Sequence, residues 1–168
     1  MKAKYNIIAF LFIGVLGAVS HFVYEWSGEN KILGYFFAVN ESTWEHLKLL
    51  FFPTIIFSVI EYFFVKKEIN NYVISVAVSV VVGMLSIIVL FNTYTGFLGY
   101  SIDFLNILIY YIALVIMLII KNKIIVNGKF SGQNSSLFGM LICFIITLFF
   151  IFFTYNPPSL AVFTPPIL

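Results

Sequence analysis

The sequence predicts an all-α fold, a multi-pass bundle of about five transmembrane helices. Apolar residues make up 62% of the 168 residues, charged residues make up 10%, and the mean hydropathy is +1.07. Soluble domains are about 45–50% apolar and about 25% charged, so an integral membrane protein in contact with the lipid bilayer is predicted. Because one span takes about 20 residues, residues 1–168 are expected to form a single helical membrane domain.

Five apolar runs of spanning length follow one another along the chain. The predicted spans cover residues 5–24, 47–65, 72–91, 102–120 and 137–153. The first run follows Lys2 and Lys4, as in a span that starts in the cytoplasm. The alternative for this run is a signal peptide cleaved at the small-residue triplet 18–20.

Lysine residues are distributed unequally between the two sides of the predicted bundle. The positive-inside rule therefore predicts a cytoplasmic N-terminus and an outer C-terminus in the cell membrane. The lysines assigned to the inner side are Lys2, Lys4, Lys66, Lys67, Lys121, Lys123 and Lys129, and those assigned to the outer side are Lys31 and Lys48. The chain contains no arginine, which argues against nucleic-acid binding because arginine supplies the bidentate phosphate contacts.

The stretch 40–53, NESTWEHLKLLFFP, passes from polar residues directly into the second span. Ser42 and Glu45 fit a capping box, so a helix is predicted to begin near Glu41. On such a helix Glu41, Glu45 and Lys48 share a face, and His46 is rotated by about 100° from Glu45. The two carboxylates need a positive partner, which is either Lys48 or a bound metal ion or cationic ligand.

Polar side chains from several segments are expected at one membrane level on the outer side. His21 and Glu25 are four residues apart and share a helix face. Ionisable groups near lipid usually face the bundle interior or a water-filled cavity, so a ligand or cation pocket is predicted. Its candidate residues are His21, Glu25, Asn40, Glu41, Glu45, His46, Lys48, Asn92, Asp103 and Asn106. Among them His21, Glu25, Glu45 and Asp103 are expected to point into one shared pocket.

Glu61 is a secondary candidate, an acid inside the second span. It either extends towards Lys66 or Lys67 at the inner surface or marks a path for an ion.

The residue types in the sequence permit a metal site, but their spacing along the chain does not indicate one. The candidate ligands His21, Glu25, Glu45 and His46 would form a two-histidine, two-carboxylate site for a divalent metal ion. Zinc prefers His and Cys ligands, and the chain contains two histidines and one cysteine. It contains no HExxH, HxxxH, CxxC, GxSxG or P-loop motif. The cofactor is therefore left open.

Three stretches resemble a family of small multi-pass membrane proteins of unknown function, mainly from Gram-positive bacteria. They are HFVYEWSG at 21–28, the stretch 40–53, and Tyr94-Thr95-Gly96 with Gly99 and Asp103. The resemblance covers most of the chain and implies the same multi-helix fold with an outer polar cluster, but it implies no activity, substrate or cofactor. Members of that family carry an acidic, glycine-containing tail after the last helix, and residues 156–168 do not show this pattern.

Three functions remain open on this basis. An outward-facing pocket could bind or conduct a cation or small polar ligand, although no inverted repeat of the transporter type is evident. A membrane-embedded, metal-dependent hydrolase could act on a lipid or peptide at the outer leaflet. The third function is that of a non-catalytic accessory or structural subunit. A homo-oligomer or a partner membrane subunit could complete the pocket of the first function.

Overall fold

The computed structural model describes residues 3–65 and 69–166, and this part of the chain is helical without strands. The elements are α1 (Ala3–Trp26), α2 (Lys31–Gly34), α3 (Thr43–Val65), α4 (Tyr72–Leu98), α5 (Asp103–Val126), α6 (Ser135–Tyr155) and a 3₁₀ turn, η1 (Ala161–Phe163). Five of these helices, all except the short α2, are long and apolar enough to cross a membrane. The predicted all-α fold with five spans is confirmed.

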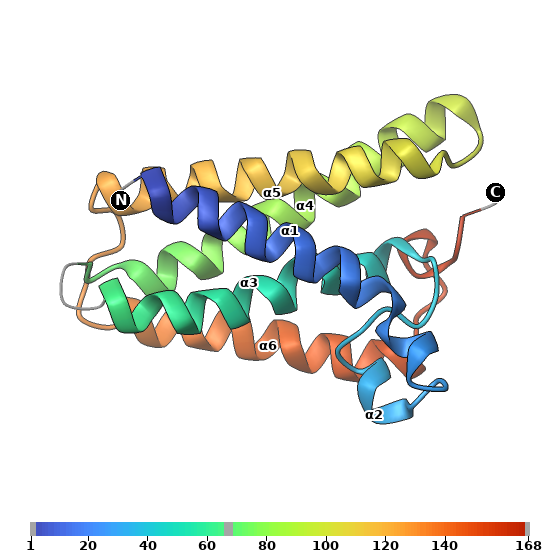
Figure 1. Ribbon diagram of the computed structural model, residues 1–168, viewed down its shortest axis with the longest axis horizontal. Helices are drawn as coiled ribbons and strands as arrows, with labels where there is room; N and C mark the ends of the chain where they lie inside the picture. Colours follow the sequence, from blue (N-terminus) through green and yellow to red (C-terminus); the bar gives the residue numbers. More distant parts are fainter. Residues whose placement is uncertain (1–2, 66–68, 167–168) are drawn as a thin grey trace.

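The five long helices run side by side, and the chain alternates direction from one to the next (Figure 1). Helix α4 contacts α3, α5 and α6, and α1 contacts α3 and α5. The distal end is the end of the bundle at which α1, α4 and α6 finish and α3 and α5 begin. The opposite end is the proximal end. Helix α1 starts at the proximal end and the C-terminal segment lies at the distal end (Figure 1). The orientation of these ends in a membrane stays a prediction.

Helix α3 lies at the centre of the apolar core. Its side chains Leu50 and Phe51 are fully buried and pack in one cluster with Val80 of α4, Leu114 of α5 and Phe150 of α6. The outward faces of all five long helices, including the second half of α3, carry large exposed apolar side chains, with many on α6. A helix that is apolar on all sides suits a bundle surrounded by lipid.

Helix α4 continues well past its predicted end at residue 91. The added turns contain polar residues, and the side chains of Asn92, Thr93 and Thr95 each donate to a backbone carbonyl one turn earlier at 2.8, 2.6 and 2.8 Å. These bonds give the three side-chain donors partners within α4 itself. The helix ends before Gly99, whose φ of 82° allows the left-handed cap in which its N–H donates to the Thr95 carbonyl.

The C-terminal segment folds back over the distal end. The ring of Phe163 in η1 lies 4.7 Å from that of Trp44 in α3 and 5.5 Å from that of Phe153 in α6. This aromatic contact brings residues up to Pro166 against the beginning of α3 and the cavity described below.

We predict that Gly139→Ala destabilises the bundle. A Cβ at Gly139 would lie 2.8 Å from the backbone nitrogen of Ile74 and 2.9 Å from the carbonyl carbon of Val73, so α4 and α6 would have to separate. The clash is expected to cost roughly 1–3 kcal/mol, which outweighs the gain of about 0.5–1 kcal/mol from alanine in a helix. Thermal unfolding in detergent measures the change.

Gly96→Ala is the matched control, because no neighbouring atom lies within 4 Å of a Cβ built there. It is expected to leave the melting temperature unchanged or slightly higher. Equal melting temperatures for the two variants would contradict the close approach of α4 and α6.

Candidate functional site

Two histidines and a glutamate meet at the distal end. His21 comes from the last turns of α1, Glu41 from the turn before α3, and His46 from the first turn of α3. Glu41 Oε2 lies 3.6 Å from His21 Nε2 and 3.4 Å from His46 Nε2. One ligand atom of each residue lies within 4.8 Å of the others. We call these three residues the His–Glu–His cluster.

The orientation of His46 is set by its other ring nitrogen. His46 Nδ1 lies 2.9 Å from the carbonyl oxygen of Ser42. A carbonyl can only accept, so Nδ1 carries the proton and, in a neutral ring, Nε2 presents a lone pair to the Glu41 carboxylate. Two acceptors that face each other require a proton or a metal ion between them.

Glu41 is an anion at neutral pH. The hydrogen bond from His46 lowers the pKa of Glu41 below its ordinary value of 4.5, partial burial opposes this shift, and the charges of His46 and His21 lower the pKa further. The side chain is 56% exposed, so the cluster is open to solvent on one side.

The local sequence explains why Glu41 lies beside the histidines. Ser42 caps α3, because its Oγ accepts from the Glu45 N–H at 3.4 Å and its own N–H donates to Asn40 Oδ1 at 2.9 Å. The helix therefore begins at Thr43, two residues after Glu41. The prediction that Glu41 and Glu45 share a helix face is wrong, because Glu41 belongs to the preceding turn.

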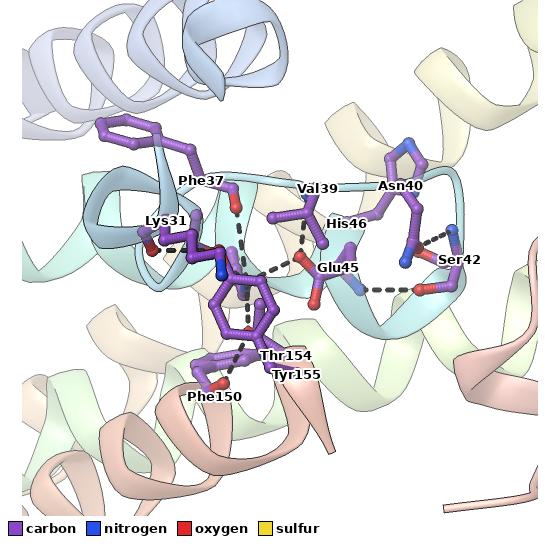
Figure 2. A network of polar contacts seen from close by, with 12 residues as sticks. Lys31, Phe37, Val39, Asn40, Ser42, Glu45, His46, Phe150, Thr154 and Tyr155 are labelled. Carbon is purple, nitrogen blue, oxygen red and sulfur yellow. Dashed lines mark hydrogen bonds and ion pairs between the residues drawn. The ribbon is translucent and has the colours of Figure 1, made fainter. Parts of the chain in front are cut away.

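Glu45 takes part in a separate, buried network (Figure 2). Lys48 Nζ donates to Glu45 Oε2 at 2.6 Å, to the Gly34 carbonyl at 2.8 Å and to Thr154 Oγ1 at 2.7 Å, with the Phe37 carbonyl at 3.3 Å. The side chains of Glu45 and Lys48 are 2% and 0% exposed. Of the two partners considered for Glu45, the structure contains Lys48, and the pair joins α3 to α2 and α6.

A cavity of about 320 Å³ lies beside the His–Glu–His cluster, between α1, α3, α4 and α5. Its wall on the α5 side contains Asp103 and Asn106. The Asn106 amide is held at both ends, because it donates to Ser101 Oγ at 2.9 Å and accepts from the hydroxyl of Tyr94. Among the described residues, the Asp103 carboxylate has no hydrogen-bond or ion-pair partner, and Asp103 is exposed.

The structure brings together five of the ten predicted pocket residues. Lining the cavity are His21, Glu41, His46, Asp103 and Asn106. The predicted single pocket that also contains Glu25 and Glu45 is not found, because Glu25 lies exposed near the end of α1 and Glu45 is turned towards Lys48.

The other two candidates have local roles at the distal end. Asn92 is exposed on α4 and bonds to its own helix, and Asn40 accepts from Ser42 in the turn before α3.

Glu61 belongs to a second buried ion pair towards the proximal end. Its Oε2 accepts from Lys121 Nζ at 2.6 Å and from the Tyr72 hydroxyl at 2.6 Å. Lys66 and Lys67, the partners expected for Glu61, lie outside the described residues, and the partners that the structure shows are Lys121 and Tyr72. Lys121, assigned to the inner loop from sequence, is buried in α5.

The fold and the site together define a class: a bundle of five helices of membrane-spanning length with a histidine and carboxylate cluster beside a cavity at one end. Residues 1–167 match the model of DUF6512, a family of unknown function, and the chain belongs to this family. This agrees with the resemblance to a family of unknown function seen in the sequence. No curated protein and no solved structure gives a significant match.

We predict that Glu45→Gln and Lys48→Met each destabilise the protein strongly. Removing one partner of a buried ion pair leaves the other charge uncompensated, which costs about 3–5 kcal/mol. The double variant is expected to lose less stability than the sum of the losses in the two single variants. A double-mutant cycle by thermal unfolding in detergent measures this coupling.

Lys31→Met is the control for this experiment, because Lys31 is an exposed lysine in the same region. Its effect is expected to stay within about 0.5 kcal/mol, as for an ordinary surface substitution. Additive effects of Glu45→Gln and Lys48→Met would contradict the ion pair.

Proposed function

We propose that the His–Glu–His cluster binds a zinc ion and that the protein is a metal-dependent hydrolase. The observation that carries this proposal is the distance of the Glu41 carboxylate oxygen from each histidine nitrogen, with the three ligand atoms within 4.8 Å of one another. Zinc bonds of about 2.0–2.2 Å in a tetrahedral site place neighbouring ligand atoms about 3.3–3.6 Å apart. The separations of Glu41 Oε2 from the two histidine nitrogens, 3.6 and 3.4 Å, are close to this value before any ion is bound.

The second ring nitrogen of His46 supports the same proposal. Metal-binding histidines usually donate their other N–H to a carbonyl or carboxylate, which fixes the tautomer and the ring orientation. The contact between His46 Nδ1 and the Ser42 carbonyl has this form. The competing interpretation is a protonated His46 in a simple ion pair with Glu41, and that interpretation predicts no metal binding.

The surroundings of the cluster favour a catalytic over a structural site. Structural zinc sites are closed by four protein ligands, whereas catalytic sites have three and leave a position for water or substrate. Here three ligands lie on one wall of the cavity. Zinc in such a site lowers the pKa of bound water to about 7 and polarises a carbonyl. Asp103, which lines the same cavity, is the proposed proton acceptor.

The proposed enzyme acts at the outer side of the cell membrane. Lys123 and Lys129 are exposed near the proximal end, and Lys31 is exposed at the distal end. Lys48 and Lys121 are buried in ion pairs, so they no longer count as loop charges. The remaining asymmetry still supports a cytoplasmic proximal end.

A pocket that only binds the cation would give zinc binding without turnover.

We predict about one zinc ion per chain in protein loaded with zinc and dialysed. His21→Ala, His46→Ala and Glu41→Gln should each weaken zinc binding at least 10- to 100-fold, the loss usually seen even for outer-shell changes. Metal analysis and competition with a chelating dye provide the measurement. Glu29→Gln, in the exposed turn after α1, is the control and should bind zinc like the original protein. Zinc at background level in the original protein would refute the site.

We further predict that zinc binding is lost between about pH 7.5 and 5.5. Histidine binds metal only when its ring is neutral, so protons compete with zinc for the two rings as the pH falls. The pKa of Glu41 is lowered from 4.5, so the carboxylate stays charged across this range and the loss on acidification comes from the histidines. Zinc titrations at stepped pH test this. A zinc affinity that stays constant between about pH 7.5 and 5.5 would contradict binding through the histidines.

A further inference from the structure

The cavity beside the cluster changes from polar to apolar along the helix axes. On α3, Thr43 and His46 lie towards the distal end of the lining and Leu49 lies one turn deeper than His46. On α5, Asp103 is at the distal end and Tyr110 is about two turns deeper. The deeper lining on α4 is also apolar, with Ile87 and Phe91. A ligand that matches this cavity has a polar group at the distal end and an apolar part towards the bundle centre.

The side of the cavity between α1 and α5 opens towards the lipid-facing surface. Phe22 of α1 and Ile107 of α5 both line the cavity, and they are nevertheless 47% and 59% exposed. Both side chains are apolar and lie on helices of membrane-spanning length. A lipid can therefore enter from the bilayer without crossing water.

The dimensions of the cavity suit a single hydrocarbon chain of a lipid. Its lining on α5 runs from Asp103 to Tyr111, which is about 12 Å at 1.5 Å per residue. One leaflet of the hydrocarbon core is about 15 Å deep, half of the whole. The volume of about 320 Å³ lies at the low end of the range for small-molecule sites, about 300–1,000 Å³, so one chain fits better than a whole diacyl lipid.

We propose that the substrate is a fatty acyl ester or amide whose acyl chain lies in this cavity. This inference rests on the proposed zinc hydrolase. In such a molecule the carbonyl is the first carbon of the chain, so it would lie where the lining changes from apolar to polar, next to the cluster. Hydrolysis adds the oxygen of water to the carbonyl carbon and breaks the C–O or C–N bond. The two protons of water end on the fatty acid, which then ionises, and on the released alcohol or amine.

Photo-crosslinking in nanodiscs tests the chain site directly. The probes are a lysophospholipid and a free fatty acid, each with a diazirine in its chain. The structure predicts labelling of cavity residues on α1 and α5 by both probes, with fatty acid release from the lysophospholipid only. Ala18→Trp, which fills the cavity from α1, should reduce labelling to the background of the lipid-facing surface. Val19→Trp is the control, because Val19 is 41% exposed and lies outside the cavity lining.

The outcomes separate this inference from the zinc site. His46→Ala should lose zinc and hydrolysis and still show cavity labelling. Zinc binding without cavity-specific labelling would overturn the acyl-chain inference and leave the zinc site standing. Cavity labelling without zinc would refute the zinc hydrolase and leave only a cavity that binds an acyl chain. Ile107→Trp blocks the cavity from α5 and replaces Ala18→Trp if that variant has a lowered melting temperature. Labelling that neither tryptophan reduces would also overturn the inference.

Discussion

The buried ion pair between Lys48 and Glu45 holds the distal end in place. A charge removed from water is costly unless its partners are complete, and here the ammonium group contacts oxygen atoms from α2, α3, α6 and the connecting segment. The same Glu45 oxygen also accepts from the Val39 N–H at 3.0 Å. Val39 lies two residues before Glu41, so the position of Glu41 beside the two histidines depends on the pair.

The motif at 40–53 thus combines two kinds of residue. Glu45 and Lys48 face inward and position the turn, while Glu41 and His46 face the cavity and provide the candidate ligands. Adjacent positions of a helix differ by about 100° in direction, which is why Glu45 and His46 serve different sites. A substitution in this motif is therefore expected to affect either the stability of the distal end or the proposed metal site, depending on whether the residue faces the bundle interior or the cavity.

A second buried pair, Glu61 with Lys121, joins α3 to α5 nearer the proximal end, and the Tyr72 hydroxyl adds α4. Each pair is formally neutral as a unit, which lowers the cost of placing its charges in a bundle of membrane-spanning helices. Both pairs include α3, the helix at the centre of the core. The bundle therefore combines outward apolar surfaces with buried ion pairs that specify which helices are neighbours.

The sequence alone determined the number of spans, because an apolar run of about 20 residues is a local property. It also determined that polar residues gather at the distal end, since connections between spans fix which segments share a level. Only the tertiary structure decided the partners. Lys121 meets Glu61 across 60 residues of sequence, and a start of α3 at Thr43 moves Glu41 away from Glu45 and next to His21. Side-chain partners depend on helix rotation and on contacts between distant segments, and neither is encoded in spacing along the chain.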